Sequence, residues 1–380
     1  SASGGNEAVR FYSSINYYKQ DGIVRRSGLE RYTLKNNLDF TAGKLTANIN
    51  MGLGYASSSF IEREGSSRAT NPVAATFYAL PYEYPYAPDG TLVSSGNEDD
   101  YPVFDQREGS NALEALLNTT KKSSQVKGII SASLNYAIAN GLVARTRLGI
   151  DYRDVTDERY INPDSYSGTK VDGEKGSFGE GTSRNTTIIS TSGLTYNKLI
   201  AQRHDIEVSG YFEFTKSNYR AFNYEGYGIN DRLPETPAGI TPGASDNPFI
   251  AVLGGSREKR ALASYIGVGR YTLDEKYTVN ASFRYDGSST VPPKNRWHGF
   301  YSVGLGWEAK KEHFLENVDL INTLRFRASY GTTASPFSQA FGYAATFGPA
   351  SYGGIGGIAP GKPGYADYDW EYAKESNFGF

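Results

Sequence analysis

The 380-residue sequence contains no cysteine, a single methionine and three histidines. The absence of cysteine excludes a disulfide framework and any thiolate metal site. The histidines, His204, His298 and His313, do not lie in an H-E-x-x-H or other metal-ligand spacing. The glycine-rich stretches do not open a helix behind a buried strand, so they do not form phosphate cradles. We therefore expect no catalytic residues, no cofactor and no metal, and hence no enzyme.

Long apolar runs and a strong net charge are lacking as well. Mean hydropathy is -0.50, and no apolar run reaches the roughly 18 residues that a transmembrane helix needs. The formal net charge is -2, so no nucleic-acid partner is indicated. Residues 1–6 have neither the basic region nor the apolar core of a signal peptide. We therefore expect the chain to be mature or to begin inside a longer protein.

Tyrosine is the abundant residue, with 30 copies beside 19 phenylalanines and 43 glycines. The chain is thus rich in aromatic groups although it has no long apolar segment. This combination is typical of strands that show one face to lipid and the other to water.

Strict alternation of apolar and polar residues is the strongest pattern. From Tyr277 to Tyr285 the odd positions are apolar or aromatic and the even positions are polar, so the two sets lie on opposite faces of a strand. The same division recurs in residues 142–153, 206–214 and 324–330. The pattern predicts eleven strands and the start of a twelfth near Glu371, at residues 8–19, 30–41, 44–58, 123–139, 141–155, 184–197, 204–218, 258–273, 276–286, 297–309 and 322–332.

The connections between these strands alternate between short and long. Short ones near 41–44, 140–141, 198–203 and 273–276 and a moderate one near 310–321 are each followed by a longer one, near 59–122, 156–183, 219–257, 287–296 and 333–370. Outer-membrane barrels have short periplasmic turns and longer extracellular loops. We therefore predict an all-β fold, an antiparallel transmembrane β-barrel in a bacterial outer membrane. The alternative is a soluble β-rich carbohydrate-binding surface protein. Such a fold does not require short and long connections to alternate.

Several motifs resemble the SusC/RagA family of TonB-dependent transporters. They occur in the family's order along the chain: Tyr17-Tyr18-Lys19-Gln20-Asp21-Gly22-Ile23, Asp286-Gly287-Ser288-Ser289, Asn295-Arg296-Trp297, Gly306-Trp307, Leu324-Arg325-Phe326-Arg327-Ala328-Ser329-Tyr330-Gly331, Asp369-Trp370-Glu371 and Asn377-Phe378-Gly379. The chain departs from the family where Tyr285 replaces Ala, Val291-Pro292-Pro293 replaces Arg-Phe-Gly, and Tyr301 replaces Pro. We expect these departures to leave the fold intact and to alter the extracellular loops.

The resemblance implies a function that the composition alone does not show. Family members import glycans or peptides with energy from TonB, carry an N-terminal plug, and work with a SusD-like surface lipoprotein. Barrels of this class have about 22 strands. We therefore expect residues 1–380 to form one partial barrel domain of 11–12 strands, with the plug, the TonB contact and the remaining strands outside this sequence. A passive outer-membrane channel or structural barrel is a further alternative.

The connection 59–122 is predicted to be a long extracellular loop with short helical turns. Asn71 is a candidate N-cap before Pro72, and residues 111–117 suggest a second helical segment. Exposed aromatics can stack on sugars or pack on peptides. Candidates for substrate or lid contact are Tyr82, Tyr84, Tyr86 and Trp297. The alternative is that these side chains seal the loop onto its neighbours.

Charged residues are predicted on the lumen side of several strands. Candidates for lumen or plug contact are Arg145, Arg147, Glu207, Glu213, Arg325 and Arg327, and Arg153 and Arg284 share their face. The alternative is ordinary solvation and pairing between neighbouring strands. Aromatics near strand ends are predicted to form the interfacial girdles: Tyr55, Phe60, Tyr152, Tyr196, Phe283, Tyr285, Trp307 and Tyr330. The carboxylates Asp99, Asp100, Asp151, Asp154 and Asp157 could suggest calcium, but such groups are more often solvated.

Overall fold

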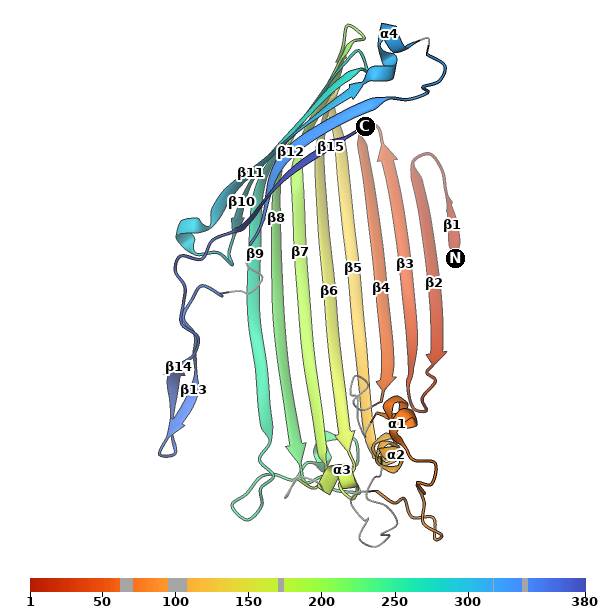
Figure 1. Ribbon diagram of the computed structural model, residues 1–380, viewed down its shortest axis with the longest axis vertical. Coiled ribbons are helices and arrows are strands. Elements are labelled where there is room, and N and C mark those ends of the chain that lie inside the picture. The colour runs from red at the N-terminus through yellow and green to blue at the C-terminus, as the bar shows by residue number, and fades with distance from the viewer. Residues whose placement is uncertain (62–70, 95–107, 170–173, 317, 337–340) are drawn as a thin grey trace.

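One antiparallel sheet dominates the computed structural model, which describes residues 1–61, 71–94, 108–169, 174–316, 318–336 and 341–380. The sheet has thirteen strands in the order β1 to β12 followed by β15. Their bounds are β1 (Ala2–Gly5), β2 (Val9–Asp21), β3 (Gly28–Ala42), β4 (Leu45–Phe60), β5 (Thr119–Ala139), β6 (Leu142–Ile161), β7 (Ser177–Ile200), β8 (His204–Tyr227), β9 (Val252–Leu273), β10 (Tyr277–Ser288), β11 (Trp297–Glu308), β12 (Arg325–Ser335) and β15 (Glu371–Gly379). Figure 1 shows β2 to β9 side by side as a tall wall.

The predicted all-β, antiparallel organisation is confirmed, and all twelve predicted strands are present. The sheet nevertheless has one strand more than predicted, because β1 is only four residues long and shows no alternation. A separate hairpin of β13 (Phe347–Tyr352) and β14 (Ile355–Pro360) was also not predicted. Several strands are longer than expected. β7 begins at Ser177 instead of 184, since residues 177–183 are polar or glycine apart from Phe178 and so show no alternation.

The two ends of the sheet differ as the connection lengths predicted. The turns at 43–44, 140–141, 201–203 and 274–276 lie at one end, and the loops that carry α1 (Pro72–Tyr78), α2 (Glu108–Asn118) and α3 (Tyr166–Thr169) lie at the other (Figure 1). We call the latter the long-loop end. None of the described helices is long and apolar enough to cross a membrane.

The Asn140-Gly141 hairpin shows why one turn requires glycine. Gly141 has a φ of 78°, a left-handed conformation that side chains rarely adopt. A Cβ at this position would lie 2.2 Å from the carbonyl oxygen of Asn197 on the neighbouring strand. The two-residue turn therefore connects β5 to β6 as predicted.

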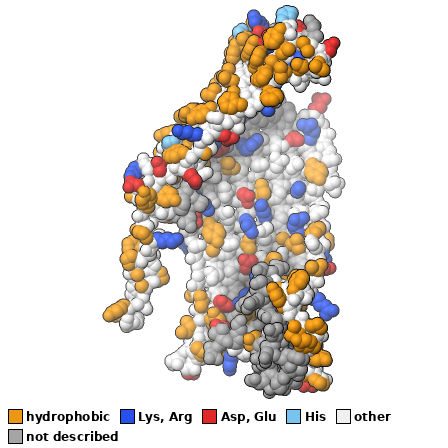
Figure 2. Space-filling model, viewed as in Figure 1, with side chains coloured by type: hydrophobic (Ala, Val, Ile, Leu, Met, Phe, Trp, Pro, Cys, Tyr) orange, Lys and Arg blue, Asp and Glu red, His pale blue; other side chains and the backbone are white. Residues whose placement is uncertain are grey.

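The two faces of the sheet are chemically distinct. Figure 2 shows one face with charged side chains scattered over polar surface; this is the lumen face. The opposite, outward face carries an aromatic ladder in which Tyr17 pairs with Tyr32 and Tyr32 with Tyr55. Phe40 follows Tyr32 on the same face of β3, about 26 Å along the strand. That spacing matches the roughly 25 Å apolar band that spans the bilayer in outer-membrane barrels.

We expect Ile130→Arg to destabilise the protein by about 2–4 kcal/mol, since Ile130 faces outward within the apolar band and a charge there contacts lipid. The matched control is Ser131→Arg, the next residue on β5, which faces the lumen. It should cost less than about 1 kcal/mol because its guanidinium stays in water. Unfolding of the refolded full-length protein in lipid vesicles measures both values. Equal costs for the two variants would contradict the assignment of faces.

Candidate functional site

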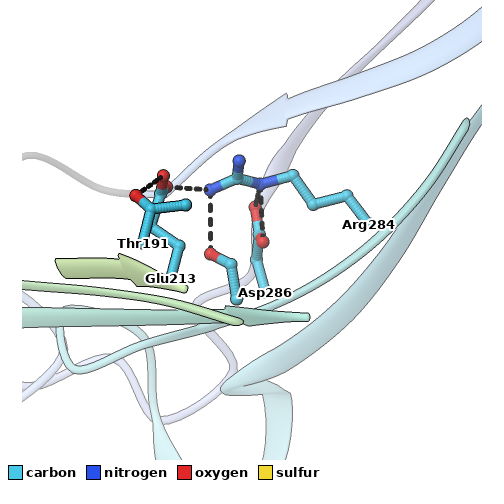
Figure 3. Close-up of polar contacts among 5 residues, drawn as sticks. Thr191, Glu213, Arg284 and Asp286 are labelled. Atoms are coloured by element: carbon cyan, nitrogen blue, oxygen red, sulfur yellow. Dashed lines mark hydrogen bonds and ion pairs between the residues drawn. The ribbon is translucent and has the colours of Figure 1, made fainter. Parts of the chain in front are cut away.

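A polar network on the lumen face connects four neighbouring strands (Figure 3). Arg284 of β10 donates from Nε to both carboxylate oxygens of Asp286 at 2.7 Å. Its Nη2 donates to Glu213 Oε1 of β8 at 3.1 Å and to Ser264 Oγ of β9 at 2.8 Å. Thr191 of β7 donates to the other Glu213 oxygen at 3.0 Å. One guanidinium thus neutralises two carboxylates through charge-assisted hydrogen bonds.

The register of the sheet brings these side chains together. Glu213 pairs with Ser264, and Ser264 pairs with Asp286, so the three residues form one cross-strand row. Arg284 lies two residues from Asp286 on the same face. Ser264 and Asp286 are buried, and the Arg284 side chain is 35% exposed. The network is therefore partly shielded from water, which strengthens its ion pairs.

A hollow of about 350 Å³ adjoins this network on the lumen face. The predicted residues Arg145, Arg147 and Glu213 line it together with Thr191 and Tyr211. The structure thus brings three of the six lumen candidates to one place. The alternating pattern predicted their face, but only the register shows that they are neighbours.

The other three lumen candidates lie apart from the hollow. Glu207 accepts a hydrogen bond from Arg270 at 3.1 Å, and Arg325 pairs with Glu308 at 3.0 Å. Arg327 lies on the same face of β12 and pairs in register with Gly379 of β15. Contact of any of these residues with a plug or a substrate stays a prediction.

The family-like motifs meet in a small core beside the network. Val291, Phe300 and Trp370 are buried against one another, and the Trp370 ring lies 5.6 Å from Phe300 in an edge-on arrangement. Trp370 also donates its indole N–H to the carbonyl oxygen of Asn295 at 3.0 Å. Val291, one of the departures from the family motif, is fully buried here. The motifs therefore have a structural role: they join the stretch 291–300 to Trp370, which is far from it in the sequence.

Trp297 lies on the outward face and not in the lumen. Its ring stacks on Tyr285 at 5.3 Å and on Tyr265 at 6.1 Å. Gly287 leaves room for this ring, because a Cβ there would lie 2.5 Å from it. Tyr285, a second departure from the family motif, thus packs against a motif residue. This placement favours a girdle role for Trp297, and its contact with a substrate or lid stays a prediction.

The described parts of the 59–122 connection contain both predicted helical segments. Asn71 caps α1 by accepting from the backbone N–H groups of Val73 at 3.0 Å and Ala74 at 3.3 Å. The second segment, α2, is longer than expected. The candidate tyrosines of this loop are exposed at 51%, 65% and 47%, for Tyr82, Tyr84 and Tyr86 in that order. Their accessibility is compatible with a partner contact, which stays a prediction.

Ionic and capping contacts join three loops at the long-loop end. Arg26 donates to the carbonyl oxygens of Leu116 and Leu117, both at 2.7 Å, and so caps the end of α2. Glu235 accepts from Lys122 at 2.8 Å. This hydrogen bond from Lys122 is the main cause that holds the pKa of Glu235 below its ordinary value. The loops thus form a connected rim.

The carboxylates considered for calcium that lie among the described residues do not form a metal-binding cluster. Within the described ranges, no group of three or more His, Cys, Asp or Glu side chains could hold a metal ion. Asp154 is bound by Arg184 at 2.6 Å. Asp99 and Asp100 lie outside the described residues.

We expect Arg284→Ala to destabilise the protein by about 2 kcal/mol, because it leaves two carboxylates without their shared cation. The value is below that of a fully buried pair since Arg284 is partly exposed. Arg325→Ala is the matched control on the same face; its pair with Glu308 is more exposed, so the loss should stay below about 1 kcal/mol. Guanidinium unfolding measures both. If Arg325→Ala lowers the free energy of unfolding as much as Arg284→Ala does, the network contributes no more to stability than an exposed ion pair.

Comparisons with known proteins agree on one family. A family model described as TonB dependent receptor-like, beta-barrel, matches residues 63–380. TonB-dependent receptor P39 of Formosa agariphila is 27% identical over 99% of this chain and 34% of that protein. TonB-dependent receptor SusC of Bacteroides thetaiotaomicron is 25% identical over 88% of this chain and 33% of that protein. The chain thus spans about a third of the length of these curated relatives.

A solved structure shares the fold over almost the whole chain. The RagAB peptide transporter superposes with a TM-score of 0.83 at 20% sequence identity, covering 99% of this chain and 41% of that one. The sheet order and the two chemically distinct faces described above are those of a barrel wall. The chain therefore belongs to the TonB-dependent receptor-like β-barrel family, whose members are transport proteins of the bacterial outer membrane and not enzymes.

Proposed function

We propose that this chain forms part of the barrel of an active importer that takes up oligosaccharides or peptides with energy from TonB. The observation that carries the proposal is the family match over residues 63–380, supported by similarity to the receptor SusC. Because the chain spans only about a third of such relatives, the plug and the TonB contact belong to other parts of the whole protein. Residues 1–380 then form one partial barrel domain.

The proposed substrate class is supported by one structural neighbour and by the lumen face. RagAB is a peptide transporter, and the lumen face around Arg145, Arg147 and Glu213 offers cations and a carboxylate to polar groups. Such a wall suits hydrated oligosaccharides or peptides that move along it. The same charges also suit a polar plug surface, so both contacts are part of the proposal.

The proposed partner is a SusD-like surface lipoprotein at the long-loop end. The loop 59–122 would be extracellular, and its exposed Tyr82, Tyr84 and Tyr86 offer aromatic surface to the lipoprotein or to the substrate. The rim contacts of Arg26 and Glu235 hold the neighbouring loops together. A preformed rim lowers the entropy lost when a partner docks.

TonB dependence separates this proposal from a passive outer-membrane channel. Uptake of labelled oligosaccharides and peptides by cells that carry the full-length protein should stop when TonB is deleted, because the plug then stays in the lumen. Expression at the surface is measured in parallel by labelling of intact cells. Undiminished uptake without TonB would favour the passive channel. A full-length gene that encodes no plug-sized domain upstream of Ser1 would also favour the passive channel.

The loop tyrosines provide a second test. We expect the triple variant Tyr82→Ala, Tyr84→Ala, Tyr86→Ala to lower uptake at limiting substrate, or recovery of the lipoprotein partner, by about tenfold, because each lost aromatic contact contributes roughly 0.5–1.5 kcal/mol. Tyr78→Ala is the matched control, since this exposed tyrosine lies at the end of α1 in the same loop. If the control and the triple variant behave alike, the three tyrosines make no specific contact.

A further inference from the structure

Three arginines stand side by side on the outward face of the sheet. Arg184 of β7 pairs in register with Arg220 of β8, and Arg220 pairs with Arg257 of β9. All three side chains are exposed. Directly opposed residues in a sheet lie about 5 Å apart, and like charges in such positions repel. The row therefore has an electrostatic cost that the sheet offsets only at Arg184, through its salt bridge with Asp154.

Two lysines enlarge this row into a basic patch, which we define as Arg184, Lys216, Arg220, Arg257 and Lys259. Lys216 and Lys259 share the outward face of β8 and β9 and are exposed. Asp154 pairs with Arg184. Among the described residues, no carboxylate lies within salt-bridge distance of the other four cations. The patch thus carries a clear excess of positive charge.

Two other outward-facing lysines toward the long-loop end are paired with acids, whereas Lys374 of β15 faces outward among the described residues without a salt bridge. Lys19 of β2 lies 3.2 Å from Glu30 of β3, its direct partner across the ladder. Lys122 of β5 lies 2.8 Å from Glu235. These two lysines are therefore neutralised within the chain, whereas four of the five cations of the basic patch are not.

The patch lies on the long-loop side of the lipid-facing surface, with Lys216 in register with the outward Ile188 and with Phe222 beyond Arg220 on the same face of β8. Along β8 the outward residues Phe212 and Phe214 are followed, toward the long-loop end, by Lys216 and Arg220. Along β9 the same direction leads from the outward Tyr265 to Lys259 and Arg257, and along β7 from Ile188 to Arg184. Aromatic residues mark the membrane interface in barrels. The cations thus lie at and just beyond the outer leaflet, where lipid headgroups are found.

We propose that the basic patch binds the phosphate groups of anionic lipid in the outer leaflet. The guanidinium fork of arginine matches phosphate oxygens in two-point hydrogen bonds. A phosphate between Arg220 and Arg257 removes the repulsion within the row. The patch is also continuous with the surface that already contacts lipid, so a headgroup reaches it without leaving the membrane. This contact is separate from transport through the lumen.

The test uses the full-length protein in detergent micelles with fluorescent bisphosphorylated lipid A as the probe. Arg220→Gln combined with Arg257→Gln should weaken binding at least about tenfold, and higher salt should weaken the wild-type interaction. The double variant Lys216→Gln, Lys259→Gln should also weaken binding of lipid A, and it tests the patch independently of the arginines. Lys19→Gln is the matched control, since this outward lysine is paired with Glu30, and its binding should equal that of the wild type. Heat-dependent gel mobility confirms that each variant is folded.

Three results would overturn the proposal. The first is equal binding of lipid A and its dephosphorylated analogue, which would mean that acyl chains alone drive the contact. The second is unchanged affinity in both double variants. The third is complete displacement of lipid A by low-millimolar inorganic phosphate, which would assign the patch to free phosphate and not to a lipid surface.

Discussion

Backbone hydrogen bonding between neighbouring strands is the constraint on which the rest of this structure depends. In hydrocarbon every peptide N–H and C=O group needs a partner from the protein, so each strand must pair with its neighbour along the whole membrane crossing. The long ladders from β3 to β9 meet this need. Their register then decides which side chains meet. A slip of one residue would exchange the lipid and lumen faces.

The two faces of the sheet differ in how their charged side chains are neutralised. On the lumen face Arg284 sits between Asp286 and Glu213, so cations and carboxylates from different strands neutralise one another. On the outward face the row that contains Arg220 and Arg257 has no such balance. The difference follows from the surroundings, because the lumen must supply its own counter-charges whereas the outward rim borders an anionic surface.

The departures from the family motifs are accommodated by packing. Val291 fills the core beside Phe300 and Trp370, and Tyr285 stacks on Trp297. In each case an unusual residue contacts a residue of another motif. Packing thus brings motifs that are separate in the sequence into contact.

The sequence by itself determined the strand pattern, the parity of the connections and local features such as the Asn71 cap and the Asn140-Gly141 turn. These depend on residues close together in the chain, so periodicity and turn chemistry suffice to predict them. The sequence did not predict strand β1 or the β13–β14 hairpin, because neither shows alternation over the length of a membrane strand. The Arg284 network, the stacking of Trp297 on Tyr265 and Tyr285, and the arginine row were decided only by the tertiary structure. They arise from the pairing of strands far apart in sequence, and alternation gives the face of a residue but not its neighbours across the ladder.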